Sequence, residues 1–230
     1  MEAENLNRLG TYSALPMPKK GSTVVVGLSG GVDSTLACML LQEAGCKVIA
    51  VTMSLWNNDL DLPPNSEGLR NSCYGPDEQI DIDACTKFCA EKNIEYHVIS
   101  VKEDYKKHVM DYFKSEYRRG RTPNPCIACN KHIKFDDFFN KARQIGCDYV
   151  ATGHYCKKDE FVNEKGEKIY RILAGDDKNK DQSYFLCQLS QEQLSKALFP
   201  IGDIDKPEVR RLAKEAGLPS AEKKESQGIC

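Results

Sequence analysis

Short runs of apolar and β-branched residues alternate with stretches of helical periodicity over much of the chain. The apolar runs predict buried strands at 23–28, 48–53, 95–101 and 148–152. Helical spacing predicts helices at 33–44 and 81–92, and a segment rich in Pro, Asn, Ser and Gly predicts a loop at 63–76. Strands that alternate with helices are typical of an α/β fold, so the pattern predicts a doubly wound parallel sheet.

Two aromatic stripes at helical spacing follow the third predicted strand. The first contains Tyr105, Val109, Tyr112, Phe113 and Tyr117, and the second contains Phe135, Phe138, Phe139, Ala142 and Ile145. An apolar face on a helix usually packs against the core. Both stripes are therefore predicted to be core rather than platforms on which nucleic-acid bases stack.

The pattern changes after Gly153. Residues 161–173 alternate around a central turn, which predicts a β-hairpin. Two short helices are predicted next, one at 190–198 with Ser190 as its N-cap and one at 207–216 with Pro207 at its first position. We therefore expect an α/β domain followed by a small region made of a hairpin and helices.

The composition is that of an ordinary globular protein. Of the 230 residues, 40% are hydrophobic and 29% are charged, which excludes global disorder. The 32 Lys+Arg residues nearly balance the 34 Asp+Glu residues, so binding of nucleic acid through bulk charge is not expected. Locally, residues 114–143 hold eight basic and three acidic side chains, whereas 55–95 hold three and nine. The basic set is either a solvated face or a set of phosphate contacts to RNA, and it includes Arg118, Arg119, Arg121, Lys131 and Lys134.

Eleven cysteines are an unusual number for such a chain. The sequence shows neither a run of about 18 apolar residues nor a signal-peptide core, so we expect no membrane contact and a cytoplasmic location with reduced thiols. Ordinary core or surface thiols are expected at Cys38, Cys46, Cys85, Cys89, Cys147 and Cys187. A zinc site built on Cys85 and Cys89 is an alternative, although a second Cys-x-x-Cys or a His pair nearby would be usual.

A glycine-rich turn follows the first predicted strand and opens the first predicted helix. Its residues are Gly27, Leu28, Ser29, Gly30, Gly31, Val32, Asp33 and Ser34. Glycines let backbone N–H groups approach an anion, and a helix N-terminus favours negative charge. The serine hydroxyls can donate to phosphate oxygens, and Asp33 could hold Mg²⁺. The turn matches neither the common P-loop nor GxGxxG, but it resembles the pyrophosphatase loop of ATP-adenylating enzymes.

A second candidate site is the pair Cys126 and Cys129, which follows Asn124 and Pro125. The prolines fix an extended entry to the pair, and the Cys-x-x-Cys spacing lets both sulfurs face one point. A metal, an iron–sulfur cluster and a redox pair are all compatible with this pattern. The last residue, Cys230, is a further candidate.

Six motifs in one order make residues 22–230 similar to the tRNA-specific 2-thiouridylases of the MnmA type. These motifs are 27–34, 120–135 (GRTPNPCIACNKHIKF), 151–155 (ATGHY), 180–186 (KDQSYFL), 198–202 (LFPIG) and 226–230 (SQGIC). The resemblance implies an adenine nucleotide alpha hydrolase-like PP-loop ATPase fold. It also implies that ATP activates the C2 oxygen of the wobble uridine of tRNA. Sulfur would then replace this oxygen, which yields 2-thiouridine, AMP and pyrophosphate.

The resemblance assigns roles to residues by position. Cys129 and Cys230 match the two catalytic cysteines, of which Cys230 receives the persulfide, and Asp33 belongs to the catalytic loop. Met53 and Gly153 match nucleotide contacts. Contacts to tRNA are implied for His154, Lys180, Asp181 and Gln182, and contacts to the target base for Asn124 and Pro125. The implied partners are tRNA and a sulfur donor, either a persulfide carrier or free sulfide. The implied domains are an extension at 1–21, a catalytic domain at 22–156 and a tRNA-contacting region at 157–230.

Two features depart from the family pattern. Most members have Asp where this chain has Cys126. Together, Cys126, Cys129 and Cys230 resemble the three cysteines that hold a 4Fe–4S cluster in other thiolation enzymes. The sequence leaves open whether a cluster or a Cys persulfide carries the sulfur. Members also usually continue past the second cysteine into a β-rich region, so we expect this chain to be either a truncated form or a minimal variant.

Other classes of function remain to be weighed. A synthetase or amidotransferase of the same superfamily, acting on a small molecule, would need neither the cysteines nor tRNA. A non-catalytic RNA or iron–sulfur scaffold and a sulfur-removing enzyme are also conceivable. The intact Ser29, Asp33 and Ser34 argue against both of these, because they indicate ATP use.

Overall fold

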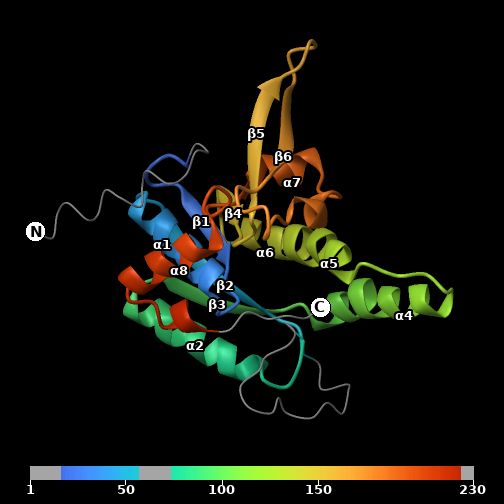
Figure 1. The fold of residues 1–230 in the computed structure, drawn as a ribbon, viewed down its shortest axis with the longest axis horizontal. Coiled ribbons are helices and arrows are strands. Elements are labelled where there is room, and N and C mark those ends of the chain that lie inside the picture. The colour runs from blue at the N-terminus through green and yellow to red at the C-terminus, as the bar shows by residue number, and fades with distance from the viewer. Residues whose placement is uncertain (1–16, 57–73, 224–230) are drawn as a thin grey trace, which may run out of the picture.

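The computed structural model describes residues 17–56 and 74–223 and is built around a five-stranded sheet (Figure 1). The strands are β1 (Thr23–Gly27), β2 (Lys47–Ser54), β3 (Glu95–Ser100), β4 (Tyr149–Ala151) and β7 (Ala197–Leu198). They lie in the order β3-β2-β1-β4-β7, and every neighbouring pair is parallel. The predicted parallel α/β sheet is confirmed.

Helices cover both faces of the sheet because successive β1 side chains point to opposite faces. The flanking helices are α1 (Val32–Glu43), α2 (Glu78–Glu91), α6 (Phe138–Gln144) and α8 (Lys206–Glu215). Val24 and Val26 share a buried cluster with apolar residues of α1, α2 and α8. Val25, between them, packs instead with Phe138 and Ala142 of α6. The sheet is therefore doubly wound, as predicted.

The chain after β4 first forms a smaller unit at one end of the sheet and then returns to the main layers with β7 and α8. β5 (Cys156–Val162) and β6 (Lys168–Ala174) form an antiparallel hairpin that projects away from the sheet (Figure 1). The 3₁₀ turn η5 (Ser183–Leu186), α7 (Gln191–Lys196) and the 3₁₀ turn η6 (Pro219–Glu222) complete this part of the chain. Ser190 caps α7 through a capping box with Gln193. The predicted hairpin and the Ser190 cap are both confirmed.

A run of helical segments connects β3 to β4. It contains α3 (Lys102–Tyr105), η3 (Lys106–Met110), α4 (Asp111–Arg118), α5 (Pro125–Ala128) and η4 (Cys129–Asp137). The segments η3 and η4 are π-helical, a rare conformation that is frequent at functional sites. In the part of the chain that the structure describes, no helix has the length and apolar character needed to cross a membrane.

The first aromatic stripe is only partly core, so that prediction is wrong for its second half. Tyr105 and Val109 are fully buried, whereas Tyr112 and Tyr117 are 37% and 57% exposed. The reason is that α4, which contains no buried residue, extends sideways beyond the sheet (Figure 1). The second stripe is buried as predicted, except at its last residue, Ile145, which is 38% exposed.

Two predicted helices have different ends in the structure. The helix predicted at 190–198 stops at Lys196, because the backbone becomes extended at Ala197 and forms β7 beside β4. The helix predicted to open with Pro207 begins one residue earlier, at Lys206, and Asp205 caps it by accepting a hydrogen bond from the Glu208 N–H. The loop predicted at 63–76 lies mostly outside the described residues.

We predict that truncating the two ends of the first stripe has very different effects on stability. Tyr105→Ala removes a fully buried ring that stacks on Tyr74, so it should lower the free energy of unfolding by about 3–5 kcal/mol. Tyr117→Ala removes a mostly exposed ring and should cost about 0.5 kcal/mol or less. Urea unfolding of both variants tests this, and equal losses would contradict the observed burial.

Candidate active site

The glycine-rich turn joins the carboxyl end of β1 to the start of α1. β1 lies between β2 and β4, and ligands of doubly wound folds bind where the chain leaves such a strand toward opposite sides. Gly30 has a φ of +73°, a left-handed conformation that favours glycine. A Cβ at this position would also lie 3.4 Å from the Cys85 sulfur of α2. The backbone conformation therefore favours glycine here, whereas the contact with Cys85 would only be close packing.

The start of α1 offers hydrogen-bond donors to an anion. Gly31 is its N-cap, and no side chain caps the helix. The first backbone N–H groups of a helix have no partners within the helix and attract negative charge. The hydroxyl oxygens of Ser29 and Ser34 lie 3.2 Å apart beside this helix end, and Ser34 Oγ also accepts from the Ser29 N–H at 3.2 Å. This arrangement fits a phosphate group.

Two further predicted nucleotide contacts lie next to this turn. A Cβ at Gly153, just after β4, would lie 2.9 Å from the backbone carbon of Asp33 and 2.9 Å from the Ser34 nitrogen. Met53 lies near the carboxyl end of β2, next to the point where β2 holds the glycine-rich turn. There the Leu28 N–H donates to the Val51 carbonyl, and the Thr52 hydroxyl donates to the Leu28 carbonyl. The structure thus brings the turn, Gly153 and Met53 together at one edge of the sheet.

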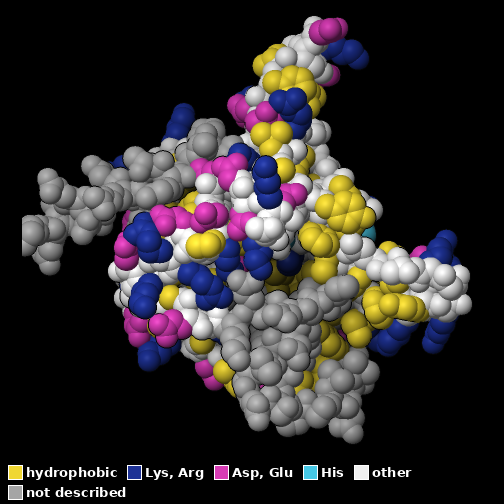
Figure 2. Space-filling view, viewed as in Figure 1, with side chains coloured by type: hydrophobic (Ala, Val, Ile, Leu, Met, Phe, Trp, Pro, Cys, Tyr) yellow, Lys and Arg dark blue, Asp and Glu magenta, His cyan; other side chains and the backbone are white. Residues whose placement is uncertain are grey.

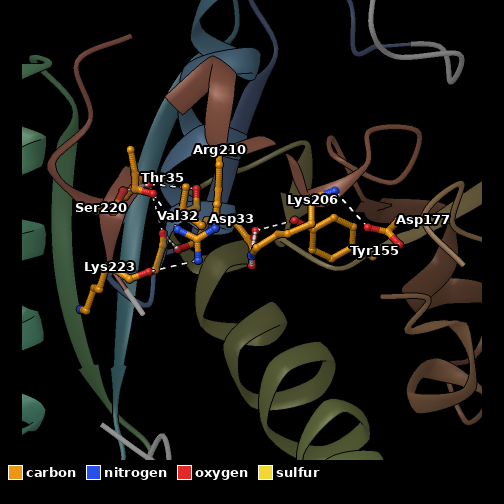
Figure 3. A network of polar contacts seen from close by, with 12 residues as sticks. Val32, Asp33, Thr35, Tyr155, Asp177, Lys206, Arg210, Ser220 and Lys223 are labelled. Carbon is orange, nitrogen blue, oxygen red and sulfur yellow. Dashed lines mark hydrogen bonds and ion pairs between the residues drawn. The ribbon is translucent and has the colours of Figure 1, made fainter. Parts of the chain in front are cut away.

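The carboxylate of Asp33 is held by two side chains from distant parts of the chain (Figure 3). Lys206 Nζ lies 2.7 and 2.8 Å from its two oxygens, and the Tyr155 hydroxyl donates to Oδ1 at 2.7 Å. The ammonium group also lies 5.5 Å from the centre of the Tyr155 ring. The Lys206 side chain is 9% exposed and that of Asp33 is 30% exposed, so this ion pair is largely shielded from water.

The segment after α8 contacts α1 through Ser220 and Thr35 (Figure 3), and it reaches the same turn through Lys223. The hydroxyls of Thr35 in α1 and Ser220 in η6 lie 2.7 Å apart and are both buried. Lys223 Nζ donates to the Gly30 carbonyl at 3.2 Å and to buried Asp81 at 2.6 Å. The described chain therefore ends beside the candidate phosphate site, and Cys230, seven residues later, lies outside the described residues.

The Cys-x-x-Cys pair lies at the start of a helix, as the prolines before it indicate. Asn124 caps α5 by accepting a hydrogen bond from the Ile127 N–H at 3.3 Å, and Pro125 is the first residue of the helix. Cys126 is half-buried, and Cys129, one turn later, is 3% exposed. Residues three apart in a helix face the same side, so the two sulfurs are on one face.

The nucleotide edge and Cys129 of the cysteine pair share an apolar wall. Cys129 belongs to a buried cluster with Leu55, Trp56 and Tyr105, and Met53 packs against that cluster. A base bound next to Met53 and a group bound next to Cys129 would therefore lie on two sides of the same cluster. The structure brings these two sets of predicted residues together, whereas Cys230 is not among the described residues.

The residues matched to tRNA contacts serve internal hydrogen bonds in this structure. His154 is buried and lies 2.7 Å from the Thr152 hydroxyl through Nδ1, and burial, followed by the charge of Lys134, holds its pKa well below the usual value. Asp181 accepts from the backbone of Gly175 and Ser183, and Gln182 accepts from the Tyr155 N–H. Lys180, Asp181 and Gln182 are all half-buried. Their contact with tRNA stays a prediction.

Most of the other described cysteines are buried thiols. Burial raises the pKa of Cys38 well above its usual value and that of Cys89 to about 12, and neighbouring cysteines add to both shifts. Such thiols stay protonated at neutral pH and are poor nucleophiles. Among the described residues, no three His, Cys, Asp or Glu side chains are grouped to hold a metal ion. The zinc alternative for Cys85 and Cys89 therefore has no support.

Basic side chains gather at the outer end of α4, as Figure 2 shows. The side chains of Arg119 and Arg121 are 64% and 58% exposed, and both pair with Glu116. Ion pairs this exposed contribute little to stability. The geometry is compatible with both expectations for this face, a solvated surface and phosphate contacts.

Comparison with known proteins identifies the family. A family model described as tRNA methyl transferase HUP domain matches residues 22–230. The chain belongs to this family. Curated relatives named tRNA-specific 2-thiouridylase MnmA are 51% identical over 208 residues in Flavobacterium johnsoniae and 46% identical over 209 residues in Clostridioides difficile. The resemblance drawn from the sequence motifs is thereby confirmed. Each match covers 90% of this chain, which spans about half the length of these relatives (50% and 54%).

Two solved structures share the fold of this family member. The U34-tRNA thiolase NcsA from Methanococcus maripaludis, determined with its 4Fe–4S cluster, has a TM-score of 0.53 at 22% identity, over 94% of this chain and 63% of that one. NMN synthetase from Francisella tularensis has a TM-score of 0.54 at 17% identity, over 98% of this chain and 75% of that one. These likenesses support the doubly wound α/β fold and nothing finer.

Sequence reasoning missed the residues that hold Asp33. Lys206 is the first residue of α8, and a cation at a helix N-terminus is unfavourable unless another group binds it. That placement, directly before Pro207, was the one available signal. Nothing in the local sequence of Tyr155 or Lys223 points to the glycine-rich turn, because these contacts join residues more than 100 positions apart.

We predict that Gly153→Ala disturbs the phosphate site. The added methyl group would meet backbone atoms of Asp33 and Ser34 at 2.9 Å, and backbone cannot move aside as a flexible side chain can. Affinity for ATP should fall by about tenfold or more, with a loss of about 1–3 kcal/mol in stability. Calorimetric titration measures the affinity. Gly75→Ala is the matched control, because a Cβ there meets nothing within 4 Å. Unchanged affinity in Gly153→Ala would contradict the close approach.

We also predict that Lys206→Met leaves the Asp33 carboxylate uncompensated. Stability should fall by about 1–3 kcal/mol, less than for a fully buried pair because Asp33 is partly exposed. Affinity for ATP should fall as well, since an unneutralised carboxylate repels phosphate. The control is Lys214→Met, whose side chain is 76% exposed on the same helix. The double variant Asp33→Asn/Lys206→Met should recover stability relative to Lys206→Met, and a strictly additive loss would contradict the pairing.

Proposed function

We propose that the protein catalyses ATP-dependent 2-thiolation of the wobble uridine of tRNA. The observation that carries this proposal is the shared wall between the nucleotide edge and Cys129 of the cysteine pair, in a chain that is 51% identical to a relative named tRNA-specific 2-thiouridylase MnmA. A small-molecule synthetase of the same fold would have no use for Cys126 and Cys129 beside the nucleotide. The proposed division is a catalytic domain at 22–156 and a tRNA-contacting region at 157–230.

The first step would form an adenylated base. The C2 oxygen of the uridine attacks the α-phosphorus of ATP, and the bond from that phosphorus to pyrophosphate breaks. The α1 N-terminus and the hydroxyls of Ser29 and Ser34 would bind the departing pyrophosphate. Lys206 offsets the negative charge that Asp33 places beside these phosphates.

Magnesium fits this site only with help from the nucleotide. Asp33 is the one carboxylate in the turn, and it already binds Lys206 and Tyr155. Mg²⁺ is commonly held by one or two carboxylates together with substrate phosphates, so Asp33 can serve as such a ligand. When bound, the ion would neutralise charge on the leaving pyrophosphate.

The second step would transfer sulfur to C2. In the persulfide route, the outer sulfur of a persulfide on Cys230 attacks C2. The bond between C2 and the adenylated oxygen then breaks, and this oxygen leaves as part of AMP. The Cys129 thiolate then attacks the inner sulfur of Cys230, which breaks the S–S bond, frees 2-thiouridine and leaves a Cys129–Cys230 disulfide. An external dithiol must reduce this disulfide before the next turnover.

An iron–sulfur cluster is the second proposed sulfur carrier. Cys126 and Cys129 lie one helical turn apart on one face, which fits two of the three ligands required, and Cys230 would be the third. A bound cluster would supply an open iron site for hydrosulfide. The U34-tRNA thiolase with a cluster shares only the fold with this chain, so the donor set carries this route.

The test is a thiolation assay with unmodified tRNA, ATP and a sulfur donor. We predict that Cys129→Ala and Cys230→Ala each lower formation of 2-thiouridine by about 100-fold or more, because each thiol makes or breaks a covalent bond. Cys187→Ala, at an exposed site, is the control and should retain activity. Pyrophosphate release that proceeds equally without tRNA and in both cysteine variants would favour the small-molecule alternative.

Cys126→Ala distinguishes the two sulfur carriers. The persulfide route needs only Cys129 and Cys230, so it predicts retained activity, whereas the cluster route predicts loss. Iron analysis and the visible absorbance of anaerobically purified protein provide a second measurement. A colourless, iron-free protein that is active with a persulfide donor would exclude the cluster.

A further inference from the structure

A cavity of about 500 Å³ opens beside the cysteine pair, between the η3–α4 segment and the α5–η4 segment that contains the pair. One wall is formed by η3 and the start of α4, and the other by α5 and η4, with Gln188 closing one side. Residues on both walls include His108, Tyr112, Asn124, Ile127 and His132. The lining therefore combines aromatic rings with hydrogen-bonding side chains.

Two histidines from different walls meet in this cavity. The rings of His108 and His132 are stacked, with centroids 4.6 Å apart and planes 19° from parallel. His108 lies in the π-helical segment η3 and His132 in the π-helical segment η4. Such segments are rare and frequent at functional sites, and here two adjacent ones each bring one imidazole to the same point.

The side chains that line the cavity suit an aromatic ligand. Burial, followed by His108 and Lys131, lowers the pKa of His132, so its ring is neutral at pH 7. Lys107 and Asp111 also line the cavity and carry opposite charges, and Tyr112 adds a ring that is 37% exposed. Aromatic rings flanked by hydrogen-bonding groups and one cation match a base and its attached phosphate.

The position of the cavity indicates which base of the RNA it would bind. Asn124, Ile127 and Ala128 line it, so it flanks Cys126 on both sides along α5. A uridine presented to the cysteine pair would bring the nucleotide adjoining it in the strand to this cavity. RNA-binding proteins commonly stack such unpaired loop bases on aromatic side chains, histidine included.

We propose that this cavity binds the base of a nucleotide adjacent to the target uridine and stacks it on the His108–His132 pair. This inference rests on the proposed function, because it takes single-stranded RNA as the substrate. It assigns the pair a role in recognising the sequence or shape around the target, separate from the bond-making steps. Neither histidine touches the reacting atoms in this assignment.

The test measures binding of the full chain to a short anticodon stem-loop RNA at low salt, with fluorescence anisotropy as the readout. The RNA is used intact and with an abasic nucleotide on the 5′ or the 3′ side of the wobble uridine. We expect His132→Ala to weaken binding of the intact RNA by about 5- to 30-fold, in line with the loss of one stacked base. One of the two abasic RNAs should show a similar loss with the unchanged protein.

Binding of the abasic RNA by the His132→Ala variant decides between stacking and a structural effect of the substitution. If the base stacks on the pair, the substitution and the abasic nucleotide remove the same contact. His132→Ala should then bind the abasic RNA no more weakly than it binds the intact RNA, and no more weakly than the unchanged protein binds the abasic RNA. His132→Phe keeps a flat ring and should restore most of the affinity. His97→Ala is the matched control, since His97 lies on β3 and pairs with Glu95.

Three outcomes would overturn the inference. Additive losses from His132→Ala and the abasic nucleotide, unchanged binding by His132→Ala, or failure of His132→Phe to restore affinity would each exclude stacking on this pair. If the unchanged protein does not bind the intact RNA, the proposed function loses its substrate, and the base site falls with it. Failure of the base site alone and failure of the proposed function are thus distinguished.

Discussion

The ion pair between Lys206 and Asp33 is the interaction on which the candidate site depends. It joins the first residue of α8 to the glycine-rich turn across 173 positions of sequence. A carboxylate in a phosphate-binding turn would repel the ligand, and a lysine at a helix N-terminus would oppose the helix dipole. Each residue thus removes the electrostatic penalty of the other, and together they hold α8 against the turn.

That attachment has consequences along the chain. With α8 in place, the buried contact between Thr35 and Ser220 and the donation from Lys223 to the Gly30 carbonyl follow within the next turns. The chain that leads to the last cysteine therefore begins at the phosphate site. On the opposite side, Met53 and Cys129 contact one apolar cluster. Two interactions therefore arrange the candidate site. The polar Lys206–Asp33 pair holds α8 at the phosphate turn, and the apolar cluster joins the nucleotide edge to Cys129.

The sheet and its flanking helices could be predicted because their signals are local. The run at 23–28 has few alternatives to a buried strand, and the capping box at Ser190 determines a helix start by itself. Helical spacing predicted an apolar face on α4 but not whether another element would cover it, and Tyr112 and Tyr117 are exposed for that reason. Leu198 became a strand because β4 offered a free edge, which is tertiary information.

The candidate site also contains some residues that local sequence reveals and others that depend on long-range packing. The glycine-rich turn and the Cys-x-x-Cys pair are contiguous in sequence, so their residue types and spacing reveal them. Lys206 and the stacked His108–His132 pair depend on long-range packing, and π-helical geometry has no sequence signature of its own. Burial raises the pKa of Cys38 and Cys89 and so keeps these thiols protonated, but it does not by itself mark the reactive ones, because Cys129 is only 3% exposed and Cys187 is exposed. What distinguishes Cys129 is its place in the apolar cluster against which Met53 packs, so selectivity among the cysteines depends on position in the fold.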